Sequence, residues 1–233
     1  MIRQLTFDLP PRDNRSRADF IVTPANALAL AALEGWRDWP GGKMVLTGPS
    51  GAGKSHLAAI WAAETGAAVV PARSLAGAGL AALAAGGAVA VEDAQALAGD
   101  AAAEAAFFHL HNLLFPTGCL LVTAAAAPRD WGLGLPDLLS RLQAAPLTRI
   151  EAPDDALLSG VLNKLFADRQ IVPPAMLIPF LLARMPRSIG AARALVARLD
   201  ARALAEGRPP GLRLAAEVLA EGSGESASDW TAD

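Results

Sequence analysis

The segment from Gly48 to Ser55, GPSGAGKS, has the residue types and spacing of a phosphate-binding loop. It lies between the apolar run 44–46, a candidate strand, and a candidate helix. Its glycines let the backbone bring N–H groups to a polyphosphate, Lys54 can reach the β- and γ-phosphates, and the Ser55 hydroxyl can bind Mg²⁺. A turn that merely caps a helix would not need the Lys-Ser pair. We therefore predict a nucleotide site that comprises Gly48, Pro49, Ser50, Gly51, Ala52, Gly53, Lys54, Ser55 and His56.

Glu92 and Asp93 form a second chemical feature, directly after the apolar run 88–91. Phosphate-loop hydrolases place an acid at the end of a neighbouring strand to hold Mg²⁺, and often a second acid beside it to orient water. Glu92 would hold the metal ion, and Asp93 would orient the water. Two acids in a solvated loop are the alternative, but the preceding strand and the upstream phosphate loop favour a functional pair.

The N-terminal sequence MIRQLTFDLP resembles the short Gln-Leu-x-apolar peptides that dock into the bacterial sliding clamp. In an extended peptide the Gln4 amide can satisfy one polar pocket, while Leu5, Phe7 and Leu9 fill an apolar groove. An edge strand or an incidental tail is the alternative. We assign these residues to clamp binding.

The elements around these motifs alternate between strand and helix. Residues 67–70, 88–91 and 119–123 form short runs that are apolar on both faces, and helices are expected between them, one of them capped by Ser74. This pattern predicts an α/β fold with a parallel sheet covered on both sides. From about Asp154 only helical spacing remains. We expect four parts: a flexible arm 1–17, an α/β nucleotide-binding domain 18–153, a helical lid domain 154–221 and a disordered tail 222–233.

Composition excludes several classes of protein. The net charge of −3 provides no general basic field, so strong autonomous binding to nucleic acid is not expected. Cys119 is the only cysteine, which excludes an intramolecular disulfide and fits a reducing compartment. The sequence has no apolar run of about 18 residues and no signal-peptide order at its start. We predict a cytoplasmic protein with no membrane partner.

The order of the motifs resembles the AAA+ module of the DnaA-related family, and most of all its short Hda-type regulators. The phosphate loop is followed by VAVEDAQAL, CLLVTAAAAP, GLGLPDLLSRL and MPRSIGAARAL, and the match spans roughly 20–221. The resemblance implies an AAA+ P-loop core with a parallel five-stranded sheet and a C-terminal helical lid. It also implies ADP or ATP with Mg²⁺ between the two, and an assembly in which one subunit's arginine contacts the next subunit's nucleotide. A homodimer is compatible with that geometry.

Four residues receive roles from the resemblance. Arg141 matches the arginine finger that acts on a partner's γ-phosphate; a surface pair with Asp137 is the alternative. Arg187 matches the lid arginine that contacts the nucleotide in the same chain; an arginine without a ligand is its alternative. Phe20 and Val22 match the segment that packs on adenine, although they fit an ordinary core equally well.

Two departures from the family pattern weaken the expected hydrolysis. Glu92 stands where the family usually has Asp, which alters the metal geometry by one methylene. Alanines fill 124–127, where a polar sensor residue is expected. We therefore expect weak or absent intrinsic ATPase activity and ADP as the resident nucleotide.

The resemblance implies a regulator of replication initiation that docks on the DNA-loaded sliding clamp, the polymerase beta subunit, and stimulates ATP hydrolysis by DnaA. Contact with DNA would be indirect, through the clamp. One alternative is a helicase loader of the DnaC type, which would need a helicase-binding region before the core. The other is a DnaA-like adaptor or anchoring protein in which Arg141 has no finger role.

Overall fold

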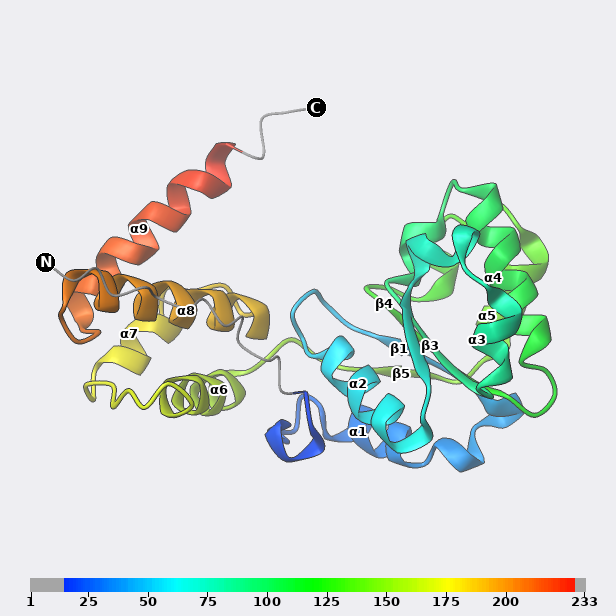
Figure 1. Ribbon diagram of the computed structural model, residues 1–233, viewed down its shortest axis with the longest axis horizontal. Coiled ribbons are helices and arrows are strands. Elements are labelled where there is room, and N and C mark those ends of the chain that lie inside the picture. Colours follow the sequence, from blue (N-terminus) through cyan, green and yellow to red (C-terminus); the bar gives the residue numbers. More distant parts are fainter. Residues whose placement is uncertain (1–14, 229–233) are drawn as a thin grey trace, which may run out of the picture.

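The computed structural model describes residues 15–228, which form an α/β part followed by a group of helices (Figure 1). The α/β part contains one sheet with the order β2-β3-β4-β1-β5, and every neighbouring pair is parallel. The strands are β1 (Lys43–Thr47), β2 (Ala68–Pro71), β3 (Ala88–Glu92), β4 (Cys119–Ala124) and β5 (Leu147–Arg149). The predicted five-stranded parallel sheet is thereby confirmed.

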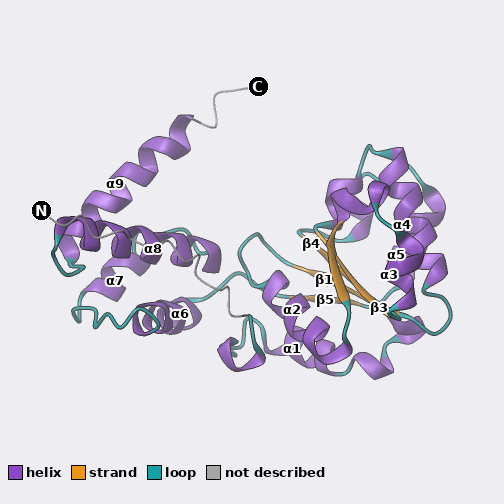
Figure 2. Cartoon of the chain, viewed as in Figure 1, coloured by secondary structure: helices purple, strands orange, loops and turns teal. Residues whose placement is uncertain are grey.

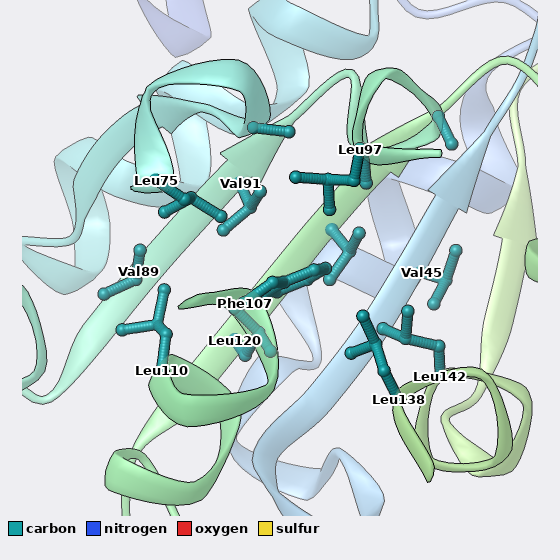
Figure 3. Packing of buried hydrophobic residues seen from close by; sticks show 14 of the residues in the cluster. Val45, Leu75, Val89, Val91, Leu97, Phe107, Leu110, Leu120, Leu138 and Leu142 are labelled. Atoms are coloured by element: carbon teal, nitrogen blue, oxygen red, sulfur yellow. The ribbon is translucent and has the colours of Figure 1, made fainter. Parts of the chain in front are cut away.

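Helices cover both faces of this sheet (Figure 2). On one face lie α1 (Ala27–Glu34) and α2 (Lys54–Thr65); on the other lie α3 (Leu80–Ala85), α4 (Ala101–Leu113) and α5 (Pro136–Ala144). Successive strand residues point to opposite faces. Val45 therefore joins the cluster under α4 and α5 (Figure 3), whereas Leu46 joins the cluster under α2. Burial on both faces explains why successive residues in the middle of the inner strands are apolar.

Two details differ from the sequence-based expectation. The Ser74 hydroxyl donates to the Pro71 carbonyl instead of capping a helix. The segment Ala72–Gly77 is a 3-10 helix, and α3 starts only at Leu80. Strand β5 was not located from the sequence, because Leu147–Arg149 is a short edge strand without an apolar run.

The C-terminal helices build a core of their own. They are α6 (Asp155–Ala167), α7 (Leu177–Leu182), α8 (Ile189–Glu206) and α9 (Leu212–Ser228). The Asp154 carboxylate caps α6 by accepting from Leu157 N (2.7 Å), and Phe166 and Leu199 are fully buried in the shared cluster. Helix α9 continues past residue 221, where we expected the tail to begin. Within residues 15–228 no helix is both long and apolar enough to cross a membrane.

Candidate functional site

The loop after β1 has a backbone that only glycine accommodates at key positions. Gly51 and Gly53 have left-handed torsions, with φ of 71° and 110°, a region that favours glycine. A Cβ on Gly48 would lie 2.5 Å from Cγ2 of Ile150 and against that residue's carbonyl oxygen. Helix α2 begins at Lys54, so its unpaired N–H groups border the loop. This is the geometry of an anion cradle at a helix N-terminus.

The helical part contacts this loop directly. The Gly51 carbonyl accepts from Ile189 N (2.9 Å), the first residue of α8. A Cβ on Gly51 would lie 2.7 Å from Cβ of Ser188 and against its hydroxyl. Ser188 is also the N-cap of α8, accepting from Ala191 N (3.3 Å). The loop and the lid helix α8 therefore meet at a glycine that leaves no room for a side chain.

We expect Gly51→Ala to displace α8 from the loop and to reduce nucleotide affinity at least tenfold, about 1.4 kcal/mol. Gly66→Ala is a matched control, because Gly66 is the C-cap of α2, the helix that follows the loop, with φ of 73°, and a Cβ there would meet nothing within 4 Å. Both variants carry left-handed strain of about 1–2 kcal/mol. Titration with a fluorescent nucleotide, together with thermal unfolding, separates the two effects. Equal affinities in the two variants would contradict the expectation.

Lys54 and the acid pair lie close together. Lys54 is buried, and its Nζ donates to the carbonyls of Gly48 (2.7 Å) and Pro49 (3.0 Å). Burial lowers the pKa of the Lys54 ammonium, whereas Asp93 and Glu92 raise it. Because β4 lies between β1 and β3, the carboxyl ends of these parallel strands share one edge of the sheet. The structure thus brings both predicted motifs to the same edge of the sheet.

The two acids have different surroundings. Glu92 is half-buried, and its Oε1 is buried without a hydrogen-bond partner among the described residues. Such an oxygen is costly unless it binds an ion or water, so Glu92 fits a role in holding Mg²⁺ together with Ser55, the second residue of α2. Asp93 is exposed at φ 55°, and its N–H donates to Oγ1 of Thr123 (3.2 Å). Its carboxylate has no hydrogen-bond or ion-pair partner among residues 15–228, and its role in orienting water remains a prediction.

Gln95 is a candidate that sequence reasoning missed. Its Oε1 accepts from Ala125 N (3.2 Å), so the side chain reaches the loop after β4 where the alanines remove the expected polar group. Gln95 lies in the 3-10 helix Ala94–Leu97, directly after the acid pair. The signal was a polar residue in the otherwise apolar run after Asp93. The Gln95 amide thus lies at the same edge of the sheet as the acid pair. It comes from the 3-10 helix Ala94–Leu97 and not from the loop after β4, where the polar residue was expected.

The segment before α1 contacts both α2, the helix that follows the phosphate loop, and α6 of the lid. His56 Nε2 is 2.9 Å from the Ser16 carbonyl oxygen, and the His56 ring meets Phe20 edge to face at 5.1 Å. Asp19 forms an ion pair with Lys164 of α6 (2.7 Å), which lowers the pKa of Asp19. Sequence reasoning missed this pair, because neither residue lies in a motif.

Of the other residues carried over from the resemblance, Phe20 and Arg187 lie near the loop. Phe20 is buried in the core with Leu57, whereas Val22 is 48% exposed. Arg187 directly precedes Ser188, and its guanidinium pairs with Asp155 of α6 (3.0 Å). Gln4, Leu5, Phe7 and Leu9 lie outside the described residues. The nucleotide and clamp roles of these residues remain predictions.

Arg141 is an exposed residue of α5. Its guanidinium carbon is 4.9 Å from the ring centroid of Phe108, and no described carboxylate, Asp137 included, pairs with it. Burial is the main cause that lowers the pKa of Lys43, and the positive charge of Arg141 lowers it further. Lys43 is the first residue of β1, whereas the loop 48–55 follows the last residue of this strand. Arg141 and Lys54 therefore lie at opposite ends of β1.

Arginines in α8 and in the turn between α8 and α9 form ion pairs with glutamates. Arg202 pairs with Glu206 and with Glu221 (2.7 Å), and Arg208 pairs with Glu217 (2.7 Å). Paired guanidinium groups have fewer free donors for a phosphate backbone. The charges on these helix faces are therefore largely balanced by ion pairs.

We expect His111 to make the stability of the fold depend on pH. Burial, then Lys43 and Arg141, lower its pKa from 6.5 to about 4. Between these values the unfolded chain binds more protons, so stability falls as the pH falls from about 6.5 to about 4. We expect this histidine to account for a loss of about 2–3 kcal/mol in the free energy of unfolding.

Urea unfolding at pH 7 and at pH 4.5 checks this expectation with His111→Gln. His109→Gln is the control, because His109 is exposed on the same helix. The His111 variant should lose less stability between the two pH values than wild type, and the His109 variant should behave like wild type. Equal losses in all three proteins would show that His111 does not carry the effect.

Comparison with known proteins comes from structures, since no model of a protein family matches the chain. Domain III of the Thermotoga maritima replication initiation protein DnaA superposes with a TM-score of 0.75 at 19% identity, covering 90% of this chain and 97% of that one. The AMPPCP-bound DnaA of Aquifex aeolicus gives 0.64 at 20% identity, covering 79% and 64%. The Thermotoga maritima RuvB branch migration motor gives 0.67 at 18% identity, covering 88% and 71%.

The chain has the AAA+ fold. The three structures of this fold align with 79–90% of the chain, and together with the five-stranded parallel sheet they confirm the predicted fold class. At sequence identities of 18–20%, the similarity extends to the fold alone. The ligands and partners of the three proteins are therefore not assigned to this chain by the comparison.

Proposed function

We propose that this AAA+ chain is a regulator of the Hda type, which supplies Arg141 to ATP bound on DnaA and thereby lowers the amount of active initiator. The observation that carries the proposal is the place of Arg141: it is exposed, unpaired with any described carboxylate, and separated from its own loop by the length of β1. A guanidinium in that place can serve a phosphate site only in another subunit. Fingers supplied in trans accelerate hydrolysis by about 10³–10⁵-fold.

The chain's own nucleotide, ADP or ATP with Mg²⁺, would be held between sheet and lid. Lys54 and the loop N–H groups would bind its phosphates, and Ser55 with Glu92 would hold the metal. When bound, the metal neutralises phosphate charge. We infer that ADP is the retained form and that intrinsic hydrolysis is weak, since Glu92 replaces Asp and 124–127 carry no polar side chain. The solved AMPPCP-bound DnaA of this fold supports an adenine nucleotide.

The N-terminal residues Gln4, Leu5, Phe7 and Leu9 would dock on the sliding clamp, so that contact with DNA is indirect. We retain the division into an arm 1–17, an α/β domain 18–153 and a lid that begins at 154, and a cytoplasmic location; because α9 runs to Ser228, the start of the tail moves from 222 to beyond that residue. In this scheme the clamp concentrates the finger near the initiator after DNA has been replicated. The expected result is protection against repeated initiation.

A reconstituted hydrolysis assay tests the proposal. DnaA carrying labelled ATP is mixed with clamp loaded on DNA, and ADP formation is followed with and without this chain. We expect stimulation that requires both the clamp and an intact Gln4-Leu5 pair. Absence of stimulation, or binding of the chain to a replicative helicase with stimulated helicase loading, would overturn the proposal in favour of the alternatives.

A further inference from the structure

One face of α4 carries an acid, an aromatic ring and an imidazole. Glu104, Phe108 and His111 are spaced by four and three residues, which places them along one side of a helix. Helices α4 and α5 cover the same face of the sheet, and their apolar residues pack into one cluster (Figure 3). This face of α4 therefore borders the helix that carries Arg141.

Glu104 determines where α5 begins. It is buried, and its two carboxylate oxygens accept from the backbone N–H groups of Gly134 (3.1 Å) and Leu135 (2.7 Å). These residues immediately precede Pro136, the first residue of α5, which has no N–H of its own. A carboxylate at this point satisfies free donors and complements the positive end of the helix. The start of α5 is thus anchored to the first turn of α4.

Phe108 holds the guanidinium of Arg141 one helical turn further along α4. The Arg141 carbon Cζ lies 4.9 Å from the ring centroid, within the range of a cation–π contact. A ring face leaves the donors on the edge of a guanidinium free, whereas a carboxylate partner would occupy them. Arg141 is therefore oriented without being neutralised.

His111 completes the surroundings of this guanidinium. It is buried, and its Nδ1 has no hydrogen-bond partner among the described residues. The positive charge of Arg141 is one of the causes that lower the pKa of His111. Because a neutral imidazole carries no positive charge, it does not repel the Arg141 guanidinium.

We propose that α4 positions the Arg141 guanidinium for an anion presented by a partner subunit, with Phe108 and Glu104 as positioning residues. This inference rests on the function proposed above.

The test measures stimulated ATP hydrolysis on DnaA as a function of the concentration of this chain. We expect Phe108→Leu to lower the maximal stimulated rate about tenfold through loss of orientation. The concentration for half-maximal stimulation should change by less than about twofold, since docking is not affected. Phe108→Tyr should restore the rate, because it keeps the ring. Glu104→Gln should lower the maximal rate in the same way.

Phe180→Leu is the matched control, because Arg184 lies over Phe180 at 4.0 Å in the lid and both rings are partly buried. An equal loss in Phe180→Leu, or a Phe108→Tyr variant as poor as Phe108→Leu, would overturn the positioning role. Arg141→Ala is run in the same assay. If it stimulates fully, the finger function itself is wrong; if it fails while Phe108→Leu stimulates fully, only the positioning role is wrong.

Discussion

Arg141→Ala is expected to reduce the stimulated hydrolysis of DnaA-bound ATP by about 10³-fold, because a finger guanidinium neutralises charge that develops on the transferred phosphoryl group. That factor corresponds to about 4 kcal/mol of transition-state stabilisation. Binding of nucleotide by this chain should be unchanged, since Arg141 lies at the opposite end of β1 from Lys54. Single-turnover hydrolysis and nucleotide titration measure the two quantities separately.

The control for this variant is Arg149→Ala. Arg149 is also an exposed arginine of the α/β part, but it already pairs with Glu151 (3.3 Å). Arg141→Lys should recover only part of the rate, because a lysine retains the charge but not the planar donor fork. Full stimulation by the Arg141→Ala protein, with its fold intact, would exclude the finger role.

Lys54→Met is expected to lower the nucleotide affinity of the chain by about 100-fold or more. Charge-assisted hydrogen bonds contribute about 1.5–3 kcal/mol each, and the Lys54 ammonium is the group that would reach the β- and γ-phosphates. The same variant loses the two contacts from Nζ to the loop carbonyls of Gly48 and Pro49. Isothermal titration with ADP and with ATP measures the change.

Lys43→Met provides a matched comparison at the other end of β1. Both lysines are 8% exposed, burial lowers the pKa of each, and each donates to a backbone carbonyl. Loss of Lys43 should leave nucleotide affinity unchanged, because it lies beside Arg141 and away from the loop. Similar affinities for the two variants would show that the loop does not bind phosphate through Lys54.

Much of the fold was predictable because its signals are local. The runs around β1, β3 and β4 are apolar on both faces, and the glycine-rich loop after β1 requires a strand before it and a helix after it. Strand β5 was not predictable in the same way. Leu147–Arg149 lies at the edge of the sheet, where one side of the strand faces no neighbour and no apolar run is needed.

The candidate site was predictable only in part. Lys54 and the pair Glu92-Asp93 were recognised from their motifs, and the sheet brings them to one edge. Gln95 and Glu104 were not recognised, since each acts on a backbone N–H that is about thirty residues away in the chain. Glu104 did leave one signal, a single acid within the alanine-rich helix 101–106.

By itself, the sequence determined the phosphate loop, the acid pair, the alternation of strand and helix, and the change to an all-helical segment near Asp154. Each of these depends on residues within a few positions of one another. Only the tertiary structure decided that Gly51 meets Ser188, that Glu104 anchors α5, and that Arg141 lies over Phe108 at the far end of β1. Those contacts join segments distant in the chain, and sheet order and helix packing, which no local pattern encodes, determine which segments meet.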